Sequence, residues 1–268
     1  MDWGLYDQES AMRQRYLDLD DRTEAIKVQM GRRGYSWGAF QQLFDISWIY
    51  HENGLEGAVL TCAEIKSAVG DQVISDVSLA GTYRGIRSQK RCIDSIRERA
   101  GNRRFVVTID FIKQLHAGLI ADPKDVGVYR RDIPIHRTYF HEIAQPQKIE
   151  ASLQEVLDYL HARPEQDLHG IELAANVHHR FMRVFPFSQH SGMLGRLLLN
   201  FVLMRAGCVP AIIHAADRQR YYEALRGSER DFRAFLVEVL ENSLENASRL
   251  LAQRQRPRSR PTLQRAAS

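Results

Sequence analysis

The sequence predicts a mostly helical protein with one β-hairpin. Apolar residues recur at three-and-four spacing along most of the 268-residue chain, which is the pattern of amphipathic helices. The segment from Met193 to Ala206 is apolar on nearly every face, as is typical of a helix at the centre of a fold. Only residues 127–143 (GVYRRDIPIHRTYFHEI) have the composition of paired strands, so we expect the single hairpin there.

Composition places the chain among globular proteins of about one domain. The hydrophobic share of 44% is enough for a core. There is no run of eighteen apolar residues and no signal-peptide pattern at the start, so we expect a cytoplasmic protein without a membrane segment. The three cysteines are widely spaced and odd in number, which favours a reducing compartment over a disulfide framework or a zinc site.

The final segment, from Ala252 to Ser268, differs from the rest in composition. It holds five arginines and no acid, together with Pro, Ser and Gln, and we expect it to be disordered. Without it the net charge of +4 nearly disappears, so the basic net charge of the chain says little about the folded body. The expected organisation is therefore an N-terminal helical region (1–70), a main domain (71–251) and a basic tail (252–268).

Helices of the first half are predicted from apolar spacing and capping residues. Thr61, with Glu64 three residues later, forms a capping box that begins a helix at Cys62, and Thr108 caps another. Residues 1–30 suit one or two helices. The expected helices are 1–30, 36–51, 62–70, 86–100 and 109–119.

Helices of the second half surround the central apolar segment. Pro186 ends the helix before it, because the proline ring cannot follow a helical turn. Gly207 ends the central helix at a position that favours a left-handed residue. The loop of small and polar residues between them opens into a buried helix, whose free N–H groups favour phosphate. The expected helices are 149–160, 171–185, 193–206, 218–227 and 231–251.

The loop and the start of the central helix, FPFSQHSGMLGR (185–196), resemble the core motif of the Fic (Fido-fold) family. Members commonly transfer AMP from ATP to a protein hydroxyl, and their pattern is His-Pro-Phe-x-Asp-Gly-Asn-Gly-Arg-x-x-Arg. Pro186, Phe187, Gly192 and Arg196 agree with it, and Gly195 also suits the family.

Two further segments resemble the family. Its target-lining hairpin, the flap, begins with G-x-Y-R, as at Gly127–Arg130 here. Many members carry an inhibitory helix with a Ser/Thr-x-x-x-Glu-Gly pattern, and residues 55–61 are similar, with Glu56 in the inhibitory place. Position 52 is Glu where Ser or Thr is usual. The likeness covers about residues 45–250 and implies a helical Fido fold with one flap and added N-terminal helices.

The motif departs from the family at its chemical positions. Phe185 stands where the family has its catalytic base, and a base needs a lone pair that phenylalanine lacks. Gln189 replaces the metal-binding Asp, and its neutral amide is a poor ligand for Mg²⁺. His190, Ser191 and Met193 replace the first Gly, the Asn and the first Arg. Binding of Mg-ATP should therefore be weakened, and we expect no resident metal.

Several residues remain candidates for binding. Arg196 would be buried and needs a partner, for which Glu56 and phosphate compete. The pair would be either a structural ion pair or a regulatory one. The resemblance implies a phosphate or nucleotide site at Ser191, Gly192, Gly195, Arg196 and Tyr222.

His190 is the one new titratable group in the motif. It would be a displaced base, a nucleotide contact or an exposed loop histidine. His178 lies on an apolar face and is expected to be a hydrogen-bonded core residue. Tyr221 and Tyr222 would either stack on a base or form a core aromatic pair.

These observations lead to three hypotheses for function. The first is a Fic-fold pseudoenzyme without AMP transfer, which binds ATP, another nucleotide, a small phosphate-containing ligand or a protein partner. The second is a transferase of altered chemistry with His190 as base. The third, binding of nucleic acid through the tail, is disfavoured because the tail lacks interleaved aromatic residues. Whether the protein is an enzyme, which ligand or target it binds, and its oligomeric state are left open.

Overall fold

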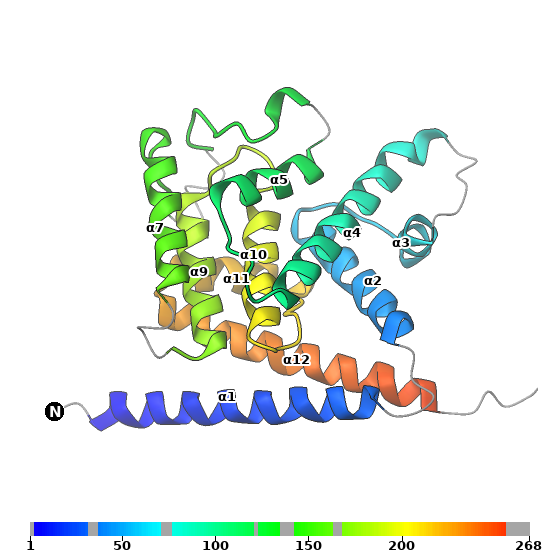
Figure 1. Cartoon of the computed structure of the whole chain (residues 1–268), viewed down its shortest axis with the longest axis vertical. Coiled ribbons are helices and arrows are strands. Elements are labelled where there is room, and N and C mark those ends of the chain that lie inside the picture. Colours follow the sequence, from blue (N-terminus) through cyan, green and yellow to red (C-terminus); the bar gives the residue numbers. More distant parts are fainter. Residues whose placement is uncertain are drawn as a thin grey trace, which may run out of the picture.

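The computed structural model describes residues 3–31, 37–70, 77–120, 123–134, 142–162 and 168–255. Within these ranges the regular elements are all helices (Figure 1). The elements are α1 (Trp3–Met30), α2 (Trp37–Leu55), α3 (Cys62–Val69), η1 (Val77–Leu79), α4 (Ala80–Gly101), α5 (Ile109–Leu119), η2 (Pro123–Asp125), η3 (Pro146–Lys148), α7 (Ile149–His161), α9 (Gly170–Val184), α10 (Ser191–Arg205), η4 (Ala215–Asp217), α11 (Arg218–Arg226) and α12 (Glu229–Gln255).

Helix α10 is the centre of the fold. Residues from Ser191 to Leu203 are all buried, because this helix is apolar on nearly every face. Helices α9 and α4 pack against it. Helices α9 and α10 lie close together at Gly195, where an added Cβ would lie 2.8 Å from the Met182 sulfur. A glycine at this position therefore sets the distance between the two central helices.

The remaining helices cover this centre. Helix α7 packs on α9, α5 packs on α4, and α12 packs on α9. Helix α1 lies along α12 at the outside of the molecule (Figure 1). Its buried face includes Tyr16 and Leu19, and Arg15 on its flank pairs with Glu241 at 2.9 Å.

Most predicted helices are present, and some are longer than predicted. The Thr61–Glu64 capping box is confirmed, as is the Thr108 cap, and α5 has the predicted bounds. Helix α2 continues past His51 to Leu55. Residues 3–30 form one helix, and α12 continues past the predicted tail boundary at Ala252.

The ends of the central helices required two corrections. Helix α9 ends at Val184, and Phe185 adopts a left-handed conformation with φ 46°. Helix α10 begins at Ser191, two positions before the predicted start, because the Ser191 hydroxyl bonds the Phe187 backbone and the Leu194 N–H already bonds the His190 carbonyl. Gly207, with φ 89°, is left-handed as predicted.

Two predictions fall largely outside the described residues. The hairpin expected at 127–143 includes residues 135–141, which are not described, and the flanking parts that are described carry no strand. The hairpin and the disordered tail from residue 256 on therefore stay predictions. Across the described residues, no helix is long and apolar enough to cross a membrane.

Candidate functional site

The loop between α9 and α10 is held in place by Arg130. Its guanidinium donates from Nε to the Phe185 carbonyl at 2.7 Å and from Nη2 to the Val184 carbonyl at 3.1 Å. The same side chain also bonds to the carbonyls of Asp132 and Ala144. Carbonyls at the end of a helix lack internal partners, and a cation there is favoured by the helix dipole. Arg130 thus joins the predicted flap region to the end of α9.

Phe185 occupies the first position of the motif and is a core residue. It is 2% exposed, and its carbonyl is bound by Arg130. A left-handed conformation is uncommon for a bulky residue, so the backbone of Phe185 is strained. The hydrogen bonds from Arg130, which we call the Arg130 clamp, and the following Pro186 hold it in this conformation. The phenylalanine ring at this position cannot accept a proton.

The loop residues that replace the family's polar ligands point to different environments. The Ser191 hydroxyl accepts from the Phe187 N–H and donates to the Phe187 carbonyl, both at 2.8 Å, so it is committed to closing the loop. Gln189 is exposed. Met193 is 4% exposed and belongs to the core. None of these three side chains brings a charge to the start of α10.

The start of α10 is covered by Glu56. A Cβ added at Gly192 would lie 2.9 Å from the Glu56 Oε1 atom and 3.1 Å from an Arg196 nitrogen. Glu56 follows directly after α2, where its N–H bonds to the Glu52 carbonyl. A carboxylate of the chain itself therefore lies where the sequence predicted an anion.

Arg196 binds two carboxylates, of which the sequence predicted one. The predicted pair with Glu56 is present through Nη2. The guanidinium also donates to Glu52 from Nε at 2.7 Å and from Nη2. Its remaining nitrogen, Nη1, faces the Tyr221 hydroxyl at 3.5 Å. All three nitrogens of Arg196 thus have partners within the protein.

Burial strengthens the mutual effect of the charges of Arg196, Glu52 and Glu56. Side-chain exposure is 3% for Arg196, 7% for Glu52 and 26% for Glu56. Burial raises the pKa of Glu52, and the charge of Arg196 opposes that rise. Burial alone would lower the pKa of Arg196, but the Glu52 carboxylate, together with Tyr221 and Glu56, raises it well above its usual value. Arg196 therefore stays charged.

A buried hydrogen-bond relay continues from Arg196. His178 places Nδ1 at 2.8 Å from the Gly195 carbonyl and Nε2 at 3.0 Å from the Tyr221 hydroxyl. A carbonyl can only accept, so Nδ1 carries the proton and Tyr221 donates to Nε2. The prediction of a hydrogen-bonded core histidine is confirmed. Tyr221 and Tyr222 are both buried, with ring centroids 5.1 Å apart, as a core aromatic pair.

His190 is half-buried, so the prediction of an exposed loop histidine is wrong. It precedes α10 in a left-handed conformation with φ 59°. Burial lowers its pKa, and the charge of Glu56 opposes that change. The imidazole is thus neutral near pH 7 and keeps a lone pair.

His116 is a neighbour of the motif that the sequence did not predict. Its ring stacks on Phe187 with centroids 3.9 Å apart. Its Nδ1 accepts from the Gly127 N–H at 3.1 Å, so Nε2 carries the proton. Burial lowers the pKa of His116 to about 4, with a smaller effect from His190.

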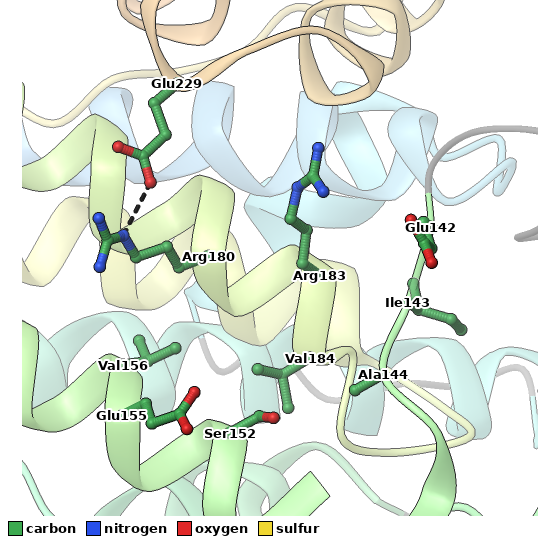
Figure 2. A pocket seen from close by; sticks show the side chains of 10 residues that line it. All are labelled: Glu142, Ile143, Ala144, Ser152, Glu155, Val156, Arg180, Arg183, Val184 and Glu229. Atoms are coloured by element: carbon green, nitrogen blue, oxygen red, sulfur yellow. Dashed lines mark hydrogen bonds and ion pairs between the residues drawn. The ribbon is translucent and has the colours of Figure 1, made fainter. Parts of the chain in front are cut away.

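Two hollows lie near the motif. One, of about 450 Å³, is bordered by the motif residues Ser188 and Gln189 and by His116 and Tyr129. The other, of about 470 Å³, lies between α7, α9 and residues 142–144 (Figure 2). Figure 2 shows Arg180 and Arg183 on its α9 side, where Arg180 pairs with Glu229 at 2.7 Å. The second hollow contains no residue of the 185–196 motif.

The structure brings most predicted site residues to the start of α10. Ser191, Gly192, Arg196, Glu56 and His190 meet there, while Tyr222 is buried beside Tyr221 in α11. Glu52 was missed as a partner, although it precedes Glu56 by four residues and so shares its helix face. No group of three or more His, Cys, Asp or Glu side chains within the described part of the chain could hold a metal ion.

Comparison with protein families gives one match. Residues 106–203 match the model of the Fic/DOC family. Protein adenylyltransferase Fic from Nematostella vectensis is 28% identical over 203 residues, covering 74% of this chain and 47% of that protein. The protein of the same name from Drosophila virilis is 26% identical over 244 residues, covering 86% of this chain and 48% of that protein. The chain thus spans about half the length of these curated relatives.

Solved structures show the same helical fold. A Fic domain containing signaling protein from Bacteroides thetaiotaomicron superposes with a TM-score of 0.76 at 23% identity, covering 89% of this chain and 98% of that one. Fic-1 from C. elegans superposes with a TM-score of 0.73 at 21% identity, covering 91% and 74%. The predicted helical Fido fold is confirmed by these neighbours.

Proposed function

Because the chain belongs to the Fic family, we propose that it is a Fic-fold protein that has lost AMP transfer and acts by binding. Its curated relatives are named protein adenylyltransferases. The ligand class is a phosphate-containing molecule or a protein partner that engages the start of α10. We further propose that Glu56 regulates this site, because it covers Gly192 in the present conformation.

The main support for the loss of transfer is that Phe185 occupies the position of the catalytic base. Transfer to a hydroxyl needs a group that takes the hydroxyl proton within hydrogen-bond reach. The side chain at the motif's base position is an aromatic ring in the core, and its backbone is tied to Arg130. Local movement of this loop would not supply a base.

The residues present do not fit Mg-ATP. Mg²⁺ favours anionic oxygen ligands, and Gln189 offers only an amide. Met193 is apolar where the family pattern has an arginine, so a second cation for phosphate is missing. Arg196 is already engaged by Glu52 and Glu56. We therefore expect the dissociation constant of Mg-ATP to lie above the micromolar range. A micromolar constant would correspond to a binding free energy of about −8 kcal/mol.

An alternative function is transfer with His190 as base. One observation favours it: His190 is neutral, half-buried and beside Glu56 at the start of α10. In this alternative, His190 would take the proton of the accepting hydroxyl, whose oxygen would bond to the phosphorus of AMP or another phosphate-containing group, while the donor's remaining part (pyrophosphate in the case of ATP) leaves.

Labelled nucleotides separate the two functions. The native protein is incubated with labelled ATP, UTP, GTP or CDP-choline, with and without lysate proteins. The pseudoenzyme predicts no label on any protein. Label that appears with native protein and disappears with His190→Ala supports the alternative. Label that persists with His190→Ala contradicts both assignments.

A further inference from the structure

The Nε edge of Arg196 is bound by a residue that the family pattern does not contain. A guanidinium binds phosphate best when it presents two parallel N–H groups. Here Nε and Nη2 both donate to Glu52, while Glu56 receives only from Nη2. The two-nitrogen edge that a phosphate would use is therefore taken by Glu52.

The two carboxylates differ in burial. The Glu52 side chain is 7% exposed, whereas that of Glu56 is 26% exposed. Water screens the attraction between a partly exposed carboxylate and its partner, and a buried pair lacks this screening. An incoming anion would thus displace Glu56 more readily than Glu52.

The backbone around Glu52 is fixed on two sides. The next residue, Asn53, exchanges two amide hydrogen bonds with Gln89 of α4, at 2.7 and 3.1 Å. Gly54 lies so close to η4 that an added Cβ would be 2.6 Å from the Ala215 Cβ. Since Glu52 lies inside α2 and directly precedes these two contacts, the backbone that carries its side chain is held in place.

Glu56, by contrast, lies beyond the end of α2. The next residue, Gly57, has φ 87°, and the turn continues into Val59, which is 95% exposed. Residues 57–59 are exposed, so the segment that carries Glu56 is held less tightly than the buried helix that carries Glu52.

We propose that Glu52 is a second lock on Arg196, so that displacement or removal of Glu56 alone does not open the anion site. The inference rests on the proposed function, because it assumes that the start of α10 is the binding site. It follows that phosphate-containing ligands bind there only when both carboxylates are removed or drawn away from Arg196. A partner that opens the site must therefore move α2 and not only the turn after it.

Nucleotide binding without metal tests the lock. Glu52→Gln, Glu56→Gln and the double variant are compared by calorimetry at pH 7, with ATP in the absence of Mg²⁺ as probe. Glu98→Gln, at an exposed position of α4 and without an ion pair among the described residues, controls for the loss of one negative charge. The expected result is that only the double variant gains affinity, by about tenfold or more over either single variant. Equal affinity of Glu56→Gln and the double variant, or no gain in the double variant, overturns the lock.

A second measurement does not depend on the double variant being folded. Proton exchange of the Arg196 Nε–H is followed by NMR, with its signal assigned by its loss in Arg196→Lys. Exchange should stay slow in Glu56→Gln and become at least about tenfold faster in Glu52→Gln, because Nε bonds to Glu52 alone. Fast exchange in Glu56→Gln, or slow exchange in Glu52→Gln, contradicts the lock.

The proposed function fails by a different observation. Transfer of labelled AMP by the native protein would contradict the pseudoenzyme while leaving the exchange pattern unchanged. If the Arg196 Nε–H exchange departs from the expected pattern in the two variants and no AMP is transferred, only the lock is contradicted.

Discussion

Replacing Arg196 by Met removes the guanidinium from the cluster while keeping a side chain of similar length. The change leaves Glu52 buried beside Glu56 without a cation. Removal of one partner of a buried pair costs about 3–5 kcal/mol, because the other charge stays in the interior. We therefore expect the free energy of unfolding to fall by this amount at pH 7.

Protonation of Glu52 limits this cost and makes it depend on pH. Starting from its ordinary pKa of 4.5, protonating the carboxyl costs about 3.4 kcal/mol at pH 7 and about 0.7 kcal/mol at pH 5. The destabilisation by Arg196→Met should thus shrink by about 2–3 kcal/mol between pH 7 and pH 5. Adding Glu52→Gln to Arg196→Met removes the buried charge and should recover part of the loss at pH 7.

Urea unfolding followed by tryptophan fluorescence measures these differences, and Trp48 lies one turn before Glu52 in α2. Arg249→Met is the matched control, since Arg249 forms an exposed pair with Glu245 and should cost about 0.5 kcal/mol or less at either pH. A loss below about 1 kcal/mol for Arg196→Met at pH 7 would refute the reasoning. So would a loss of equal size at both pH values.

Three further predictions concern the loop and the motif. Arg130→Leu should lower stability by about 2–4 kcal/mol in urea unfolding, because the carbonyls of Val184 and Phe185 lose their donors; a loss near zero would show that the clamp is dispensable. His116 has a folded pKa of about 4, below its ordinary 6.5, so its stabilising effect is present above pH 6.5 and is lost as pH falls towards 4. The melting temperature of His116→Gln should therefore fall less between pH 7 and pH 5 than that of the native protein, and identical slopes would contradict this origin. Phe185→His alone should give no self-AMPylation in a labelled-ATP assay, because positioning, charge and base act as a unit. The combined set Phe185→His, Gln189→Asp, His190→Gly, Ser191→Asn and Met193→Arg should give detectable label once Glu52→Gln and Glu56→Gly free Arg196 for phosphate. Label from the single variant Phe185→His would contradict the non-additivity.

The sequence predicted the helices well where local signals were strong. The Thr61–Glu64 box and the Thr108 cap fixed two helix starts, since each is made within one turn of chain. The motif likewise placed Arg196 beside Glu56, because both positions match a family pattern. The apolar residues on nearly every face of the segment from Met193 to Ala206 also identified α10 as the buried centre.

Other features depend on contacts between distant segments and left no local signal. The role of Arg130 requires the end of α9 to lie beside it, about fifty residues further along the chain. The left-handed Phe185 could not be inferred, because bulky residues rarely adopt that conformation. Glu52 counted in the sequence as a departure from a pattern, although its spacing from Glu56 placed both on one helix face.

The most direct test of the pseudoenzyme is the intact mass of the native protein after incubation with Mg-ATP. The same measurement on the repaired motif set, carried in a background of Glu52→Gln and Glu56→Gly, serves as a positive control for the scaffold. We expect an unchanged mass for the native chain and an added AMP group in the repaired one. An AMP adduct on the native protein that disappears with His190→Ala would contradict the loss of transfer and identify His190 as the base.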